Sequence, residues 1–289
     1  MSKKIEILND VLYDGFLSRW KSIGPPWRPS LRECLFADVE IKKIRKDEPL
    51  KALVLGVTPE WRDVLHMNGV DAVLCDAKES MMKSMTSVCY YEPVKEIFIE
   101  SDWLSISSHF KENEFDIVIS DRPQDNIPYE KWNILWGEIK KVLNPNGILL
   151  LGIANNDFTN QKTFEEMLSV YRNNPLEFKY HYQRLIWLYD IATSCGAYDK
   201  ELYKLNFEIL RKYLVKEGRE FGATDEELDG LWFVRDDVFS GSFGDFIETL
   251  PPLETTLRSL EKSGFKLNLL SDHKDDSFMD IKRMACLTK

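Results

Sequence analysis

The chain has 289 residues, of which 44% are hydrophobic, and a formal net charge of −10. This length suits one large domain, or one domain that carries a sizeable insertion. The acidic balance opposes binding to a phosphate backbone, and no apolar run is long enough to cross a membrane, so we expect neither nucleic acid nor a membrane as a partner.

The first residues and the cysteines give two further expectations. The opening string MSKKIEILND lacks the apolar core of a signal peptide, which favours a cytoplasmic location. The five cysteines are scattered without a C-x-x-C pair, and the four histidines have no metal-ligand spacing. We therefore expect reduced thiols and no metal site.

Residues 1–48 are expected to form a helical and irregular N-terminal segment. Within it, the string PPWRPS at 25–30 is stiffened by its prolines and carries Trp27 and Arg28. Side chains in such a segment either contact a ligand or only anchor a terminus. The sequence leaves both roles open.

The stretch that follows carries the most specific pattern in the chain. An apolar strand at 52–55, a turn at Gly56, a short helix around Trp61 and a second strand at 72–75 follow one another. A unit of this kind that closes on an acidic residue, here Asp76, is typical of the nucleotide-binding half of a doubly wound sheet. Gly56 permits a sharp turn close to a ligand, and Asp76 is placed to accept hydrogen bonds from both hydroxyls of a ribose. The loop reads GVTPE instead of G-x-G-x-x-G, which argues against a dinucleotide.

The alternation of strands and helices continues to the C-terminus. The run FDIVIS at 115–120 is almost continuously apolar, as in a strand buried on both faces, and it stops at Asp121. Apolar residues at spacings of three and four predict an amphipathic helix over 129–143, which NPNG at 144–147 ends. The remaining predicted elements are a helix at 80–85, strands at 95–100 and 148–151, a helix around Leu257 and Leu260, and strands at 266–270 and 281–287.

This order resembles the class I S-adenosylmethionine-dependent methyltransferase fold, a Rossmann-like, doubly wound α/β sheet of seven mostly parallel strands whose last strand is antiparallel. The matching strings are LVLGVTPE, VLCDA, SDW, FDIVISD and IKKVLNPNGILLLG, within about residues 50–153 and 253–289. The last string is the most specific, because helix, L-x-P-x-G turn and buried strand recur together in that family. PPWRPS followed by LGVTPE further resembles a poorly characterised bacterial branch of the same superfamily.

The resemblance implies a site for S-adenosyl-L-methionine at the carboxyl ends of the strands. The residues implied for the adenosine are Asp76, Ala77, Met81, Ser101, Asp102 and Trp103. The two acids would accept hydrogen bonds from the ribose and from the adenine amino group, and capping a helix is the alternative role for each. Met81 either packs under the adenine or belongs to the core.

The methionine end departs from the family pattern. The family usually has an acidic residue two positions before the first glycine and a G-x-G run after it, whereas this chain has Val54 and then Val57 and Thr58. We therefore expect Gly56, the Thr58 hydroxyl and main-chain N–H groups to hold this end. Arg28 is the candidate for the cofactor carboxylate, since a guanidinium matches a carboxylate bidentately.

About a hundred residues, 155–250, separate the fifth strand from the next core helix, where the core fold needs only a short loop. Their apolar spacing is strongly helical, and TDEE at 224–227 is a capping box. We expect a helical lid that closes a small-molecule pocket. His181 in this insertion and Asp121 at the mouth of the fourth strand are the predicted catalytic residues, and Asp121 is also a predicted cofactor contact, near the transferred methyl group. The alternatives are that the aromatic cluster around His181 packs in a core or a homodimer interface, and that Asp121 is an exposed loop acid.

These patterns predict an enzyme whose cofactor-binding core comprises residues 49–154 and 251–289. The expected reaction moves a methyl group from S-adenosyl-L-methionine to an oxygen or nitrogen of a small molecule. Two alternatives stay open. In one, the protein binds this cofactor or a nucleotide without catalysis and its insertion binds a partner; in the other, the fold serves a different adenosyl or nicotinamide nucleotide.

Overall fold

The computed structural model describes residues 20, 28–91, 96–154, 163–174, 183–228, 230–231, 248–272 and 282–289. The chain divides into two compact units. The first comprises Met1–Gln124, Glu130–Asn155 and Pro252–Lys289, and the second comprises Asp125–Tyr129 and Asn156–Pro251.

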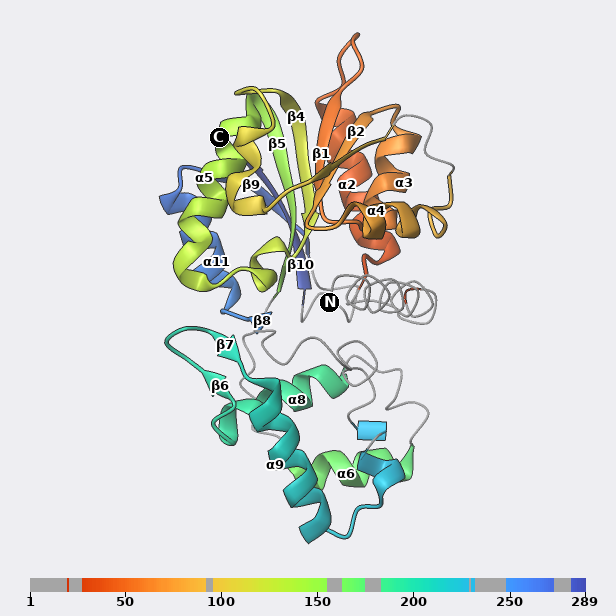
Figure 1. The fold of residues 1–289 in the computed structure, drawn as a ribbon, viewed down its shortest axis with the longest axis vertical. Coiled ribbons are helices and arrows are strands. Elements are labelled where there is room, and N and C mark those ends of the chain that lie inside the picture. The colour runs from red at the N-terminus through yellow and green to blue at the C-terminus, as the bar shows by residue number, and fades with distance from the viewer. Residues whose placement is uncertain are drawn as a thin grey trace, which may run out of the picture. The chain divides into compact units, whose positions relative to one another are not determined.

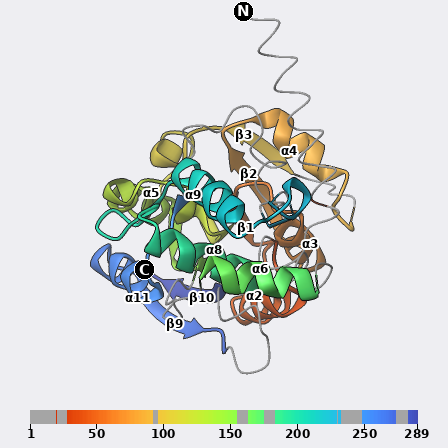
Figure 2. The same cartoon turned by 90° about the horizontal axis from the view of Figure 1, so that it is seen from below.

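A seven-stranded sheet of order β3-β2-β1-β4-β5-β10-β9 forms the centre of the first unit (Figure 1). The strands are β1 (Lys51–Leu55), β2 (Asp71–Asp76), β3 (Ile97–Glu100), β4 (Phe115–Asp121), β5 (Leu143–Ala154), β9 (Lys266–Leu270) and β10 (Lys282–Thr288). Strands β1 to β5 are parallel, and β10 runs antiparallel to both β5 and β9. The predicted doubly wound sheet with one antiparallel strand is therefore confirmed. Figure 2 shows β3, β2 and β1 in this order along the sheet.

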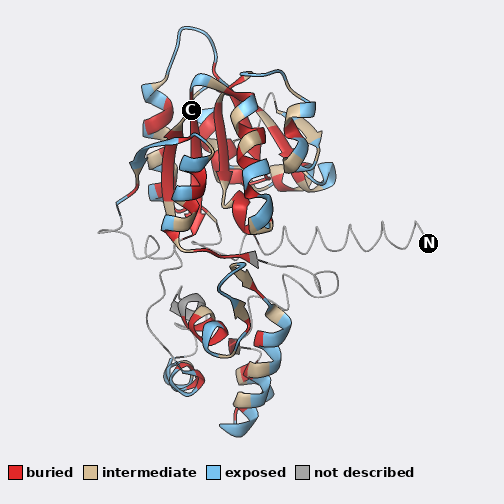
Figure 3. Cartoon of the chain, turned by 90° about the vertical axis from the view of Figure 1, so that its left-hand side faces the viewer, coloured by how far each residue is buried: buried red, intermediate tan, exposed pale blue. Residues whose placement is uncertain are grey.

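Helices cover both faces of this sheet (Figure 1). On one face lie α2 (Leu31–Lys43), α3 (Pro59–Met67) and α4 (Glu79–Thr86), and on the other lie α5 (Trp132–Val142) and α11 (Leu253–Lys262). Side chains alternate between the two faces along each strand, so Val54 of β1 joins Trp61 of α3 in one core while Leu53 is buried on the opposite face. Figure 3 shows this distribution, with buried residues concentrated on the strands and exposed residues on the outer sides of the helices.

Local sequence explains where two of these helices begin. Ser30 and Glu33 form a capping box at the start of α2: the Glu33 N–H donates to Ser30 Oγ (3.3 Å), and the Ser30 N–H donates to Glu33 Oε2 (2.7 Å). Pro59 occupies the first turn of α3, where its missing N–H has no helical partner to lose. Helix α3 begins just after the carboxyl end of β1, and Glu33 in the first turn of α2 contacts Lys282, which is opposite Ala154 at the end of β5.

The turn NPNG lies inside a strand, which the sequence did not predict. Strand β5 begins at Leu143 and resumes regular pairing with β4 only at Ile148, across a register shift. The Asn146 N–H donates to Asn144 Oδ1 at 3.0 Å, which closes a tight turn within the strand. A Cβ on Gly147 would lie 2.7 Å from a main-chain oxygen of β4, so the close approach of the two strands requires glycine there.

The second unit combines helices with a small sheet. Its described helices include α6 (Phe164–Asn173), α8 (Gln183–Ser194) and α9 (Phe207–Glu220). The short antiparallel strands β6 (Tyr198–Asp199), β7 (Lys204–Leu205) and β8 (Glu248–Thr249) form a sheet that the helical pattern did not predict. The predicted capping box is confirmed, since the Glu227 N–H donates to Thr224 Oγ1 (3.2 Å) and the Thr224 N–H to Glu227 Oε2 (2.7 Å).

None of the helices among the described residues is long and apolar enough to cross a membrane.

Candidate functional site

Three predicted residues meet at the carboxyl ends of neighbouring strands. Gly56 directly follows β1 with a φ of 104°, a conformation that favours glycine, and its N–H donates to the carbonyl of Cys75 in β2 at 2.9 Å. A Cβ on Gly56 would lie 3.9 Å from Asp76 Oδ2 and 3.8 Å from the ring of Trp103. The space that this glycine leaves open is therefore bounded by a carboxylate and an indole.

Asp76 is a partly buried acid at the end of β2. Its Oδ1 accepts a hydrogen bond from the Ala77 N–H at 2.7 Å, while its Oδ2 faces Gly56. Burial raises the pKa of Asp76 to about 6, against smaller opposing effects of hydrogen bonds from the Ala77 and Lys78 main chain. At neutral pH the group is an anion that has lost part of its hydration, so hydroxyl donors from a ligand would stabilise it.

The segment after β3 supplies the other wall of this space. Trp103 begins the 3₁₀ helix η1 (Trp103–Ser108), and its Nε1 donates to the Cys75 carbonyl at 2.9 Å, which fixes the indole beside β2. The exposed Asp102 accepts from the Leu104 N–H at 2.9 Å and so has its alternative role as a cap. The Ser101 N–H donates to the Asp76 carbonyl at 3.0 Å. The adenine contacts of Ser101 and Asp102 remain predictions.

Met81 lies on α4 and packs, partly buried, against the core cluster. This packing agrees with the core role that the sequence left open. A contact with adenine remains a prediction.

A buried cluster of charges lies further along the same edge of the sheet. Lys282, the first residue of β10, places its Nζ 3.0 Å from Asp121 Oδ1 and 2.9 Å from Glu33 Oε1. The three side chains are only 1%, 8% and 2% exposed, respectively. Burial disfavours a charge on Lys282, but Asp121 and Glu33 together raise its pKa above the ordinary value, so the ammonium persists.

This cluster changes how two sequence expectations are understood. The Asp121 side chain is only 8% exposed and is ion-paired, so its alternative role as an exposed loop acid is wrong. The sequence analysis missed Lys282 and Glu33. A lysine that opens an apolar strand normally faces solvent, and the glutamate of a capping box is already explained by the cap.

Thr58 lies in the loop after β1, and Arg28, which precedes α2, contacts Glu60 in the first turn of α3. Arg28 Nε donates to Glu60 Oε1 at 2.6 Å, and its Nη1 donates to the Trp20 carbonyl at 3.1 Å. Burial raises the pKa of Glu60, and the charge of Arg28 partly offsets this effect. Thr58 is buried immediately before α3. Contacts of Arg28 and Thr58 with the cofactor remain predictions.

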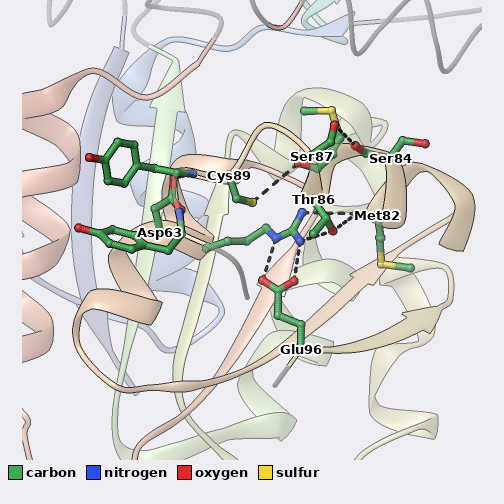
Figure 4. Close-up of polar contacts among 11 residues, drawn as sticks. Asp63, Met82, Ser84, Thr86, Ser87, Cys89 and Glu96 are labelled. Carbon is green, nitrogen blue, oxygen red and sulfur yellow. Dashed lines mark hydrogen bonds and ion pairs between the residues drawn. The ribbon is translucent and has the colours of Figure 1, made fainter. Parts of the chain in front are cut away.

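A second buried ion pair joins Arg62 of α3 to Glu96, the residue before β3. Arg62 of α3 donates through Nε to Glu96 Oε1 (2.8 Å), through Nη2 to Thr86 Oγ1 (2.6 Å) and through Nη1 to the Met82 carbonyl (3.4 Å). Figure 4 shows Glu96, Thr86 and Met82 gathered around these contacts. The guanidinium thus joins α3 and α4, the helices before and after β2 in the chain, to the residue that precedes β3.

Two candidates lie outside the described residues: the predicted catalytic residue His181, and Trp27, which precedes Arg28 in the sequence. Among the described residues, there is no group of three or more histidines, cysteines or acids that could hold a metal ion. The five cysteines form no disulfide, and burial raises the pKa of Cys75, beside the site, to about 12.

Comparisons with known proteins identify the fold. No protein-family model matches the sequence, and a search of curated proteins finds no significant match. Many solved structures are similar, all of those described here at low sequence identity. One is an S-adenosylmethionine-dependent methyltransferase from Mesorhizobium loti, with 12% identity, a TM-score of 0.50, and coverage of 89% of this chain and 98% of that chain.

Two further structures match over almost their whole length. A TehB-like S-adenosylmethionine-dependent methyltransferase from Corynebacterium glutamicum has 10% identity and a TM-score of 0.50 over 97% of this chain and 99% of that chain. A putative zinc-dependent alcohol dehydrogenase from Rhodobacter sphaeroides has 15% identity and a TM-score of 0.55 over 96% and 97%. Together with the strand order, these similarities show that the chain has the class I S-adenosylmethionine-dependent methyltransferase fold.

Proposed function

We propose that the protein is a methyltransferase that uses S-adenosyl-L-methionine and transfers its methyl group to an oxygen or nitrogen of a small molecule. The observation that carries this proposal is the arrangement of Gly56, Asp76 and Trp103. They bound one space at the carboxyl ends of strands in a sheet of this order, which is where open α/β sheets bind ligands.

The described residues fit an adenosine. Asp76 Oδ2 faces the space above Gly56 and is the natural acceptor for ribose hydroxyls, and the fixed indole of Trp103 offers an apolar face to a base. A Cβ on Gly56 would fill the same space, which agrees with a ligand passing close to the backbone. The cofactor, when bound, supplies a methyl group already activated by a sulfonium.

The methyl end of the cofactor belongs near the tip of β4 in this proposal. Leu55 of β1 pairs with Ser120 of β4, so Gly56 and Asp121 follow on adjacent strands about 4.8 Å apart in the pairing direction. A ligand whose ribose binds Asp76 and which crosses Gly56 therefore reaches Asp121 next. The protein contributes alignment of the acceptor with the methyl group and exclusion of water, effects worth up to about 7–11 kcal/mol.

The helical insertion is proposed to select the acceptor. In this proposal residues 155–250 close over the pocket, and His181 takes a proton from the acceptor when the chemistry requires it.

We also propose a cytoplasmic location, with a homodimer as the expected assembly if the aromatic cluster around His181 lies at an interface.

Isothermal titration with S-adenosylhomocysteine tests the cofactor assignment. The folded protein should bind it, and Asp76→Ala should weaken binding by about 10–100-fold, because charge-assisted hydrogen bonds to both ribose hydroxyls are lost. Asp71→Ala is a matched control, since Asp71 is the exposed acid at the opposite end of β2. Absence of binding by the folded wild type contradicts the proposal, and unchanged affinity in Asp76→Ala contradicts the ribose assignment.

Methyl transfer is tested separately with donor labelled on the methyl group and a metabolite extract. Label should enter small molecules in the presence of the wild type and not of Asp76→Ala. Binding of S-adenosylhomocysteine without any transfer would instead favour the non-catalytic cofactor-binding protein.

A further inference from the structure

Lys282 joins three elements that are distant in the chain. Its Nζ lies between Glu33 of α2 and Asp121 of β4, at 2.9 Å and 3.0 Å, and all three side chains are buried. A buried ion pair is weak evidence for a role in stability, because well-packed apolar residues often serve stability equally well. The place of this cluster at the carboxyl edge of the sheet therefore calls for another explanation.

The backbone around Asp121 is shaped to orient its carboxylate. Asp121 is opposite Gly152 on β5, and a Cβ on Gly152 would lie 2.4 Å from Asp121 Oδ1. The carboxylate thus lies over this glycine, between β4 and the start of β10. Arg122, the next residue, adopts a φ of 52° and donates its N–H to the Gly152 carbonyl at 3.1 Å. A residue other than glycine in the left-handed region is strained, so the surrounding contacts must hold it there.

The second partner of Lys282 is itself immobilised. Glu33 uses Oε2 to accept from the Ser30 N–H at 2.7 Å, which leaves Oε1 directed at Lys282. The Lys282 ammonium therefore contacts Glu33, which is fixed by the helix cap, on one side and Asp121 on the other. Other charges that act on this cluster include Glu60 of α3 and Arg122 after β4, which have opposite signs.

We propose that Lys282 is a positioning residue that holds the Asp121 carboxylate at the tip of β4, where this anion favours the positively charged sulfonium of S-adenosylmethionine over the neutral thioether of S-adenosylhomocysteine. The inference rests on the proposed function, because that function places the sulfur near β4. Asp121 acts through its charge, and Lys282 and Glu33 act through Asp121.

The test compares dissociation constants for S-adenosylmethionine and S-adenosylhomocysteine by isothermal titration. The selectivity ratio is the dissociation constant of S-adenosylhomocysteine divided by that of S-adenosylmethionine. Asp121→Asn should lower this ratio by about tenfold, since one close charge interaction with the sulfonium is lost. Lys282→Met should reduce the same ratio, and Lys282→Arg should restore it to within about threefold of the wild type. If these residues had only a structural role, the substitutions would weaken the binding of both ligands equally and leave the ratio unchanged.

The chain offers a matched control on the same strand. Asp116, at the other end of β4, pairs with the exposed Lys46 at 2.6 Å. Asp116→Asn and Lys46→Met remove the same charges far from the proposed site and should leave the ratio unchanged.

Each outcome decides the question. Asp121→Asn keeps the ion pair between Lys282 and Glu33, so this variant still tests the proposal if Lys282→Met fails to fold. A wild-type ratio in folded Asp121→Asn or folded Lys282→Met overturns the positioning role while the proposed function stands. If the folded wild type binds neither ligand, the proposed function itself fails and this inference falls with it.

Discussion

Replacing Asp76 by asparagine should stabilise the folded protein and weaken its binding of the cofactor. The folded state raises the pKa of Asp76 from 3.8 to about 6, chiefly through burial. The folded protein therefore holds this proton more tightly than the unfolded chain does. By linkage, the free energy of unfolding falls as the pH rises from about 4 to about 6, and above that the loss is constant at about 3 kcal/mol.

Asp76→Asn removes this pH-dependent cost, since an amide does not titrate, and its oxygen can still accept from the Ala77 N–H. The variant should exceed the wild type in free energy of unfolding by about 1.5 kcal/mol at pH 5 and about 3 kcal/mol at pH 7.5. Urea unfolding at both pH values measures the difference. Asp71→Asn, at the exposed end of the same strand, is the control and should show no such trend.

Two results would refute this reasoning. One is a variant less stable than the wild type at pH 7.5, and the other is a difference that does not grow between pH 5 and pH 7.5. The expected combination of higher stability with weaker S-adenosylhomocysteine binding would mark Asp76 as a residue kept for a ligand at the expense of the fold.

Two further substitutions test the scaffold around the site. Gly152→Ala places a Cβ 2.4 Å from Asp121 Oδ1 and should lower the free energy of unfolding by about 1–3 kcal/mol in thermal denaturation; an unaltered melting temperature would contradict the close packing. Arg62→Leu leaves the buried Glu96 carboxylate without its cation and should cost about 3–5 kcal/mol in urea unfolding. The double variant with Glu96→Leu should recover part of that loss, and no recovery would mean that packing of Arg62, and not its charge, matters.

The fold was predictable because its strands have clear local signals. The run FDIVIS reads as a strand buried on both faces, and β4 is Phe115–Asp121. The same local logic misplaced NPNG, because Asn144–Gly147 has turn chemistry and the structure accommodates that turn within β5. Only the neighbouring strand decides whether such a turn separates two elements or bends one.

The proximity of three candidate residues was also predictable. Parallel strands place their carboxyl ends at one edge, so residues after β1, β2 and β3 had to lie close together, and Gly56, Asp76 and Trp103 do. The charge cluster was not predictable in this way. Lys282 and Asp121 are 161 positions apart, and nothing local to either residue indicates the other.

The late position of β10 in the chain has a consequence for synthesis on the ribosome. This strand pairs with β5, yet roughly 130 residues separate Ala154 from Lys282. At about 5–20 residues per second, translation of that interval takes about 6–26 s. Throughout it, β5 is an open edge that invites pairing with other nascent chains, and Glu33 and Asp121 still lack the ammonium that pairs with both of them. Fragments truncated before β10 should therefore aggregate, because residues 282–289 supply both the strand that covers β5 and the cation that pairs with Glu33 and Asp121.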